Sequence, residues 1–180
     1  MTRPSLRLLT VGLLAGAAFS LQTPALAAPP PGAMASPYYH AGNWDAFTAH
    51  APGRPAVCGI GTHNPNDHRS FTLRFEAGGT QLLLRALKPS WTIPSGTSVN
   101  VVMQIGHGAP WPATATGNGQ QIDWTIPAVQ SQSFETQFRQ AASMTLSFPG
   151  GTEPIWTLGL NGSSAITDAF NRCVGQITAP

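Results

Sequence analysis

The sequence predicts a mainly β domain, an antiparallel β-sandwich or barrel-like fold with one short internal helix and a C-terminal helix. Apolar and polar residues alternate with a period of two over many short segments, and turns rich in glycine and proline separate these segments. Only two segments have helical periodicity instead. Many short strands joined by tight turns are typical of an antiparallel arrangement rather than of a parallel sheet.

The first 27 residues have the pattern of a secretory signal peptide. Arg3 and Arg7 precede a mostly apolar run from Leu8 to Leu21, and residues 25–27 (Ala-Leu-Ala) form a small-residue cleavage pattern. The run is shorter than the roughly 20 residues that a spanning helix needs. We therefore expect cleavage near Ala27, a periplasmic or secreted protein, and no membrane-spanning segment in the mature chain.

The mature chain is expected to be a proline-rich flexible leader over residues 28–43, followed by a single β-rich domain over residues 44–180. Two of the nine basic residues leave with the signal peptide, so seven basic residues face seven acidic ones. A neutral chain with scattered charges has no electrostatic footprint for nucleic acid or for an anionic membrane. Its partner is therefore expected to be a protein or another component of the envelope, and not nucleic acid.

Eight strands are predicted within this domain, each bounded by turn residues. The alternation is clearest over residues 70–76, where Phe71, Leu73 and Phe75 share one face. The predicted strands cover residues 44–50, 56–62, 70–76, 80–87, 98–106, 121–126, 143–148 and 155–160.

Two further segments are predicted to be helices. Residues 130–142 place apolar side chains at i, i+4 and i+7, which is one face of a short internal helix. Residues 161–175 follow the same pattern near the C-terminus. We expect Asn161 or Ser163 to cap the first turn of this second helix and Gly175 to end it.

Cys58 and Cys173 are the only cysteines in the chain. An even pair in an exported protein favours a disulfide over two buried free thiols. The bridge would tie the C-terminal helix to the strand over residues 56–62. The loop that it closes runs from position 58 to position 173, which stabilises the fold by about 4–5 kcal/mol in the chain-entropy model.

The segment THNPNDHRS, residues 62–70, contains the candidate metal ligands. His63, Asp67 and His68 are residue types that bind zinc or copper. Their spacing is not that of a recognised ligand motif, whereas the sequence NPND between them has turn-forming chemistry at every position. We therefore favour a hairpin turn and expect no metal or other cofactor, with a metal-dependent enzyme as the alternative.

No residue pattern supports a catalytic site. His107 lies between two glycines without a recognisable nucleophile, and the serines at 163 and 164 lack the G-x-S-x-G elbow. The seven acidic residues lie in turns or at the polar positions of amphipathic segments, where solvated charges belong. We therefore expect no catalytic or cofactor-binding residues.

Trp91 and Trp111 are the candidate partner-binding residues. Both lie between prolines in expected loops, and rigid exposed aromatic side chains are frequent binding hot spots. A tryptophan in such a position also commonly covers an end of the hydrophobic core, and we favour this structural role on general grounds of burial.

Several segments together resemble the invasion-associated locus B family of secreted bacterial proteins. They are the strand at Trp44, the segments VCGIGT and LKPSWTIPSGTSVNVVMQI, and above all the ending WTLGLNGSSAITDAFNRCV. The apparent match covers roughly residues 44–174. The resemblance implies an envelope-associated or secreted β-rich domain, named for a role in host-cell invasion, and it implies no catalytic residue.

The functional hypothesis from the sequence is an exported, non-enzymatic binding module that is envelope-associated or secreted and acts in host or surface interaction. One alternative is the secreted metal-dependent enzyme that would use His63, Asp67 and His68. A further alternative is a small protease inhibitor, which only the size, the compartment and the disulfide-tied scaffold suggest.

Overall fold

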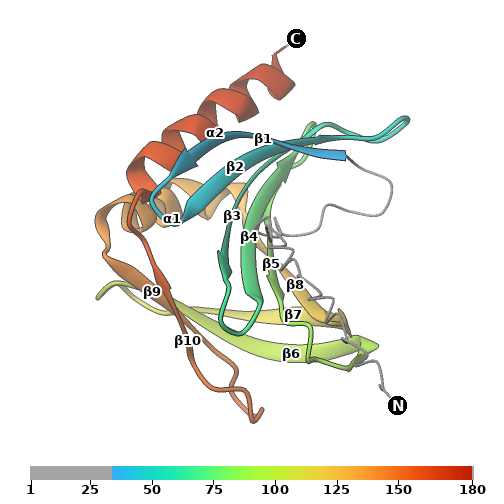
Figure 1. The fold of residues 1–180 in the computed structure, drawn as a ribbon, viewed down its shortest axis with the longest axis vertical. Coiled ribbons are helices and arrows are strands. Elements are labelled where there is room, and N and C mark those ends of the chain that lie inside the picture. The colour runs from blue at the N-terminus through green and yellow to red at the C-terminus, as the bar shows by residue number, and fades with distance from the viewer. Residues whose placement is uncertain (1–33, 180) are drawn as a thin grey trace, which may run out of the picture.

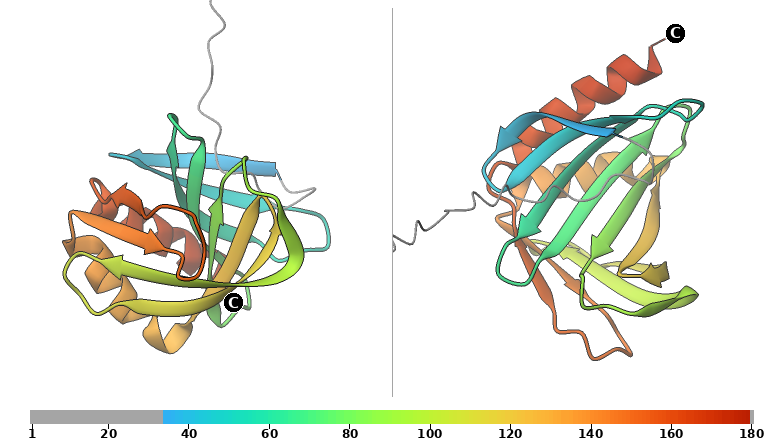
Figure 2. Two further views of the ribbon diagram at one scale, coloured as in Figure 1. Left: turned by 90° about the horizontal axis from the view of Figure 1, so that it is seen from below. Right: turned by 45° about the vertical axis from the view of Figure 1, so that its right-hand side comes forward.

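A single antiparallel sheet of ten strands, with two helices at one side of it, makes up the computed structural model, which describes residues 34–179 (Figure 1). The predicted signal peptide, its cleavage site and residues 28–33 of the leader lie outside the described residues. The strand order is β1-β2-β3-β4-β5-β8-β7-β6-β9-β10. The sheet curls into a half-barrel, so that β10 comes to face the strands β2, β3 and β4 (Figure 2).

The predicted mainly β class is confirmed, and the architecture is barrel-like because one sheet curls instead of two sheets packing face to face. Eight of the ten strands lie where the alternation predicts them, with shifted ends, and β1 and β7 are additional. The strands are β1 (Met34–Ala41), β2 (Trp44–His50), β3 (Val57–Asn64), β4 (Arg69–Glu76), β5 (Gln81–Leu87), β6 (Ile93–Ile105), β7 (Trp111–Gly119), β8 (Gln121–Pro127), β9 (Ser143–Ser147) and β10 (Trp156–Gly159).

Strand β1 corrects the prediction of a flexible leader for residues 34–41. These residues pair with β2 in antiparallel register, from Met34 opposite His50 to Ala41 opposite Trp44. The register shifts between Pro37 and Tyr39, so the proline lies at an irregularity of an edge strand, where its missing N–H is tolerated. Residues 34–41 therefore form a strand, although proline in this segment led to the prediction of a leader.

Strand β7 corrects the expectation of a loop around Trp111. Its sequence, WPATATGNG, alternates alanine with threonine and, after Trp111, lacks the large apolar side chains that mark the other strands. Ala115 is nevertheless buried in the core, and the strand pairs with β6 on one side and with β8 on the other. A strand with small core residues gives too weak a hydrophobic alternation to be recognised from sequence.

The two predicted helices are present as α1 (Ala128–Gln140) and α2 (Ser163–Thr178). The predicted ends of α2 are wrong. Gly162 is the N-cap, with φ of 88° and no side-chain capping bond, and a Cβ at this position would lie 2.2 Å from the carbonyl oxygen of Ala41. The helix continues through Gly175 because Ile177, in its last turn, packs against the core.

The core lies between the concave face of the sheet and the two helices. Trp44 is fully buried, and its ring meets Phe138 of α1 edge-on at 4.9 Å and Phe71 of β4 at 6.2 Å. The predicted disulfide is confirmed, since Cys58 of β3 is bonded to Cys173 of α2 with 5.9 Å between their Cα atoms. The bridge fixes α2 to the sheet.

Candidate binding cleft between β10 and the β3–β4 hairpin

A cleft of about 560 Å³ opens where the curled sheet fails to close. One wall is β10, and the other is formed by the start of β2, the end of β3 and the start of β4. We call this feature the seam cleft. The residues that line it are His40, Asn43, Asp45, Thr62, His63, Asn64, Pro65, Arg69, Ser70, Phe71, Trp156, Thr157, Leu158 and Gly159.

The first end of the seam cleft is closed by the turn between β1 and β2. The Trp44 indole Nε1 donates a hydrogen bond to the carbonyl oxygen of Gly159 at 3.1 Å. The backbone N–H of Asn43 donates to the carbonyl oxygen of Asn161 at 3.2 Å. Gly42 permits this approach, because a Cβ there would lie 2.2 Å from the Asn161 oxygen. The two walls are thus held together at this end by direct hydrogen bonds.

The second end is closed by Arg69, the first residue of β4. Its guanidinium lies over the Trp156 ring, with 5.1 Å between the guanidinium carbon and the ring centroid. Asp67 forms an ion pair with the same guanidinium and accepts the backbone N–H of Arg69 at 3.2 Å. Arg69 therefore anchors the β3–β4 hairpin to β10, and Asp67 of the same hairpin orients its guanidinium.

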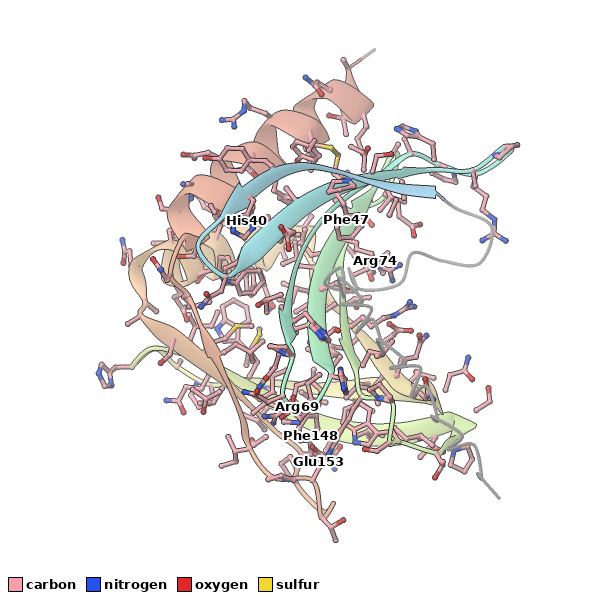
Figure 3. The ribbon with its side chains drawn as sticks, viewed as in Figure 1. His40, Phe47, Arg69, Arg74, Phe148 and Glu153 are labelled. Carbon is pink, nitrogen blue, oxygen red and sulfur yellow. A yellow bond between two sulfur atoms is a disulfide. The ribbon has the colours of Figure 1, made fainter. Side chains whose placement is uncertain are left out.

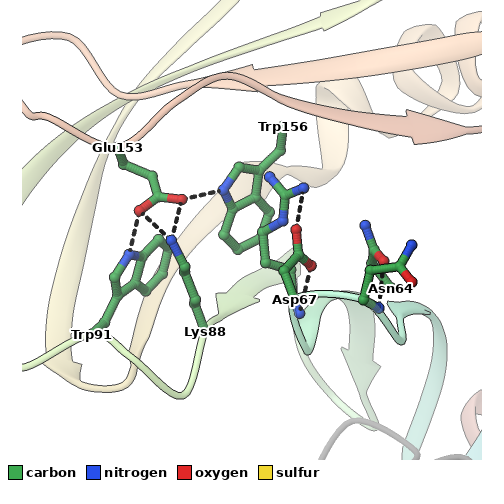
Figure 4. Close-up of polar contacts among 8 residues, drawn as sticks. Asn64, Asp67, Lys88, Trp91, Glu153 and Trp156 are labelled. Atoms are coloured by element: carbon green, nitrogen blue, oxygen red, sulfur yellow. Dashed lines mark hydrogen bonds and ion pairs between the residues drawn. The ribbon is translucent and has the colours of Figure 1, made fainter.

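Trp156 also belongs to a cluster of polar and aromatic side chains centred on Glu153 (Figure 4). Lys88 Nζ donates to both oxygens of the Glu153 carboxylate at 2.9 Å. Trp91 Nε1 donates to Oε2 at 2.9 Å, and Trp156 Nε1 donates to Oε1 at 2.8 Å. One carboxylate therefore joins the β5–β6 loop, the β9–β10 loop and β10, and we call these four residues the Glu153 cluster.

The Glu153 carboxylate is held ionised by its neighbours. Its side chain is only 15% exposed, and this burial acts to raise its pKa. The hydrogen bonds from Lys88, Trp156 and Trp91, together with the charge of Lys88, outweigh the burial and bring the pKa below its usual value. All four contacts use the charged form, so this carboxylate fastens the loops together and is not available as a general acid.

The expectation that Glu153 is a solvated acidic residue is wrong, because its side chain is largely buried among these partners. The residue lies in the segment FPGGTEP, which has the composition of an ordinary turn. Two of its partners lie 62 and 65 positions away, and the third, Trp156, lies three positions away at the start of β10. The prolines around Glu153 and the nearby tryptophan indicate a rigid loop, but they do not indicate which residues contact the carboxylate.

The hairpin interpretation of residues 62–70 is confirmed. The strands β3 and β4 pair up to Asn64 opposite Arg69, and His68 takes a left-handed conformation with φ of 57°. Asn64 Oδ1 accepts the backbone N–H of Asn66 at 3.0 Å, which is the turn chemistry expected of asparagine.

The predicted ligands His63, Asp67 and His68 are only partly brought together. The two imidazole rings lie side by side with 6.0 Å between their centroids, but the Asp67 carboxylate is bound to Arg69. His63 Nδ1 lies 3.1 Å from the Ser70 hydroxyl oxygen. Across residues 34–179, no three histidine, cysteine, aspartate or glutamate side chains form a group that could hold a metal ion.

His107 does not join the histidines of the hairpin. It is exposed in the turn between β6 and β7, in a shallow hollow formed with the C-terminal part of α1. A Cβ on the neighbouring Gly108 would lie 2.6 Å from the Gln137 side chain, which shows how closely this turn follows the helix. His107 is therefore a surface residue on a different part of the molecule.

Trp91 and Trp111 are both half-buried, and both donate their indole N–H groups within the protein. Trp91 stacks on Trp156 with 5.2 Å between ring centroids and donates to Glu153. Trp111 donates to Gln137 Oε1 at 3.1 Å and meets Phe134 edge-on. Each tryptophan thus covers part of the core and fixes a loop or a helix, which is the role that the sequence analysis favoured.

A second, smaller cavity of about 160 Å³ lies between the two helices and the strands β3 to β5. Its lining is mostly apolar and includes Phe75, Leu82 and Val174. Arg139 spans the helices beside it, with ion pairs to Glu135 at 2.9 Å and to Asp168 at 2.7 Å. This cavity results from the packing of the two helices on the sheet and offers few polar groups to a ligand.

The fold and the seam cleft define a mainly β protein with an open groove at the seam of its sheet. No protein-family model, curated protein or solved structure matches the chain. Among the described residues, neither helix is long and apolar enough to cross a membrane.

Proposed function

We propose that the protein is an exported, non-enzymatic binding module whose binding site is the seam cleft. The observation that carries the proposal is a cleft of about 560 Å³ with walls fastened together at both ends. This volume is in the range of known ligand sites, and preformed walls reduce the entropy that binding costs. The disulfide between β3 and α2 suits an oxidising, extracytoplasmic compartment.

The polar groups of the cleft support binding rather than catalysis. His40 Nδ1 lies 2.8 Å from Asp45 Oδ1, and Asp67 is bound to Arg69, so both carboxylates have cationic or polar partners. A hydroxyl–imidazole pair does occur between Ser70 and His63. Ser70 is only 6% exposed, however, so its hydroxyl is poorly placed to attack a substrate.

The resemblance to the invasion-associated locus B family adds host or surface interaction to this proposal. The metal-dependent alternative is not favoured, because Asp67, its proposed third ligand, faces Arg69. No feature of residues 34–179 favours the protease-inhibitor alternative. The arrangement of the cleft therefore favours the binding module.

The experiment compares two matched variants in a capture assay. The exported protein is immobilised and exposed to envelope extract and to culture supernatant. His63→Trp places a large side chain in the seam cleft, whereas His107→Trp makes the same change in the exposed β6–β7 turn. We expect a component that wild type and His107→Trp retain and His63→Trp does not. Equal capture by both variants, or no capture by wild type, would contradict the proposal.

A further inference from the structure

Strand β10 presents a free edge to the seam cleft. Leu160 N–H donates to the carbonyl oxygen of Ala142 at 2.9 Å, and the register continues with Leu158 opposite Met144 and Trp156 opposite Leu146. In an antiparallel pair, alternate residues direct both backbone groups to the same side. The even-numbered residues of β10 therefore bond to β9, and Thr157 and Gly159 direct their backbone groups away from it.

The contact made by Trp44 confirms this direction. Its indole donates to the carbonyl oxygen of Gly159, so that oxygen faces the seam cleft. The remaining groups on this edge are the N–H and C=O of Thr157 and the N–H of Gly159, and both residues are exposed. No hydrogen bond to another residue of the described chain engages these three groups. These three groups are therefore arranged as on the edge of a strand that has no paired strand on this side.

The opposite edge of the sheet, β1, is protected against pairing with a further strand. Pro37 lies at a register shift, and the Tyr38 hydroxyl donates to the carbonyl oxygen of Ala169 in α2 at 3.0 Å. Strand β10, with the sequence WTLG, contains no proline and no charged residue. The unprotected edge is thus the one that lies in the cleft.

We propose that β10 takes up an extended peptide segment of another protein as an additional strand. This inference rests on the proposed function and names its ligand class. The peptide backbone would accept from and donate to Thr157 and would accept from Gly159, about 4.8 Å away, as in any sheet. Because β10 has four residues, the bound segment is short. The nearby Asp45 and Asp67 are already paired, so an uncharged segment is favoured.

The enclosure of the cleft argues for a flexible segment of a partner over a second copy of this chain. The edge lies between two closures, Trp44 on Gly159 and Arg69 on Trp156. The stretch of edge between them is only four residues long, which suits a short extended segment better than the long, preformed sheet edge of a second copy.

The leader that the predicted cleavage near Ala27 would leave is too short to reach the cleft. Six residues, the number from 28 to 33, span at most about 22 Å when fully extended. Strand β1 starts at Met34, opposite His50, and reaches the seam only at Ala41, opposite Trp44. The seven residue steps along β1 amount to about 23 Å. The leader therefore leaves the site open to another protein.

The test begins with a phage-displayed library of random 12-residue peptides, selected on the exported protein. Selected peptides are synthesised with a fluorescent label, and their affinity is measured by anisotropy. Thr157→Pro removes the N–H that faces the cleft while sparing the ladder to β9, and proline is tolerated at such edge positions. Thr157→Val is the matched control because it keeps the backbone N–H.

We expect at least tenfold weaker binding to Thr157→Pro and less than a twofold change for Thr157→Val. Methylation of alternate amides of the peptide should abolish binding to wild type, and this measurement does not depend on how well the proline variant folds. Equal affinity for wild type and Thr157→Pro, or a selection that yields no peptide, overturns the inference. Peptides that lose affinity for His63→Trp but not for Thr157→Pro would leave the cleft as a binding site and remove β10 as its strand.

Discussion

The β3–β4 pair is fastened to the rest of the molecule in two different ways at its two ends. Near the start of β3, Cys58 is covalently bonded to α2, and near the hairpin, Arg69 lies on Trp156 beside the Glu153 cluster. Figure 3 shows the disulfide far from Arg69 and Glu153. A disulfide restricts the unfolded chain as well as the folded one, whereas the polar contacts exist only in the folded state.

This difference indicates separate roles for the two ends. The disulfide end fixes α2 on the sheet and so maintains the core. The polar end sets how β10 faces the hairpin and so maintains the seam cleft. Its ion pairs respond to pH and to salt, which the disulfide does not. Changes at one end are therefore expected to leave the other largely intact.

Loss of the disulfide should have the largest effect. Cys58→Ser together with Cys173→Ser is expected to lower the free energy of unfolding by up to about 4–5 kcal/mol, because the unfolded chain regains the entropy of a long open loop. Urea denaturation of the double variant measures the change, and wild type with its bridge reduced is the control. Stability equal to that of the oxidised wild type would show that the bridge does not constrain the fold.

Loss of the Glu153 charge should have the next largest effect. Glu153→Gln leaves Lys88, whose side chain is 22% exposed, without the Glu153 carboxylate as its anionic partner. The amide keeps only one acceptor oxygen, so one of the two indole N–H groups loses its acceptor. We expect a loss of about 2–3 kcal/mol in the free energy of unfolding. Glu76→Gln removes a carboxylate of β4 outside the cluster and should cost less than about 0.5 kcal/mol. Equal costs for the two variants would refute a special role for the cluster.

The stabilising effect of Glu153 should disappear in acid. The pKa of this carboxylate is lower in the folded than in the unfolded state, so its contribution is complete above the unfolded pKa of about 4.3 and is lost as the pH falls through the folded pKa. The stability difference between wild type and Glu153→Gln should thus be constant from pH 7 to pH 5 and shrink below about pH 4. Urea denaturation from pH 7 to pH 2 measures it, and a difference as large at pH 2 as at pH 7 would contradict the assignment.

The two ends also differ in how far the sequence predicts them. The disulfide follows from two cysteines in a chain whose sequence predicts export, and most of the strands follow from alternation. Strands β1 and β7 were not predicted, because proline in β1 and small residues in β7 obscure the alternation of apolar and polar side chains.

The seam cleft could not be predicted because its parts are distant in sequence. Lys88 and Glu153 are 65 positions apart, and Trp44 and Gly159 are 115 positions apart. Local patterns identify His63, Asp67 and His68 as unusual, but only the folded chain shows that Asp67 orients Arg69 toward Trp156. Such pairings depend on the curl of the whole sheet, which no local period encodes.

The smallest expected effect concerns the stacking of Arg69 on Trp156. Arg69→Lys keeps the positive charge but loses the planar group over the ring. Arg85→Lys is the matched control, because Arg85 is also paired with a carboxylate, that of Asp123, and it is not stacked on Trp156. We expect the Arg69 variant to lose about 0.5–1 kcal/mol more than the control.

Hydrogen exchange then shows which end of the strand pair has loosened in the Arg69 variant. The amides of residues 62–70 should exchange faster, because the hairpin is no longer anchored to β10. The amides near Cys58 should keep their wild-type rates, since the disulfide still holds that end. Uniform acceleration along β3 would mean that the two ends form one cooperative unit, and the separation of roles between them would then be wrong.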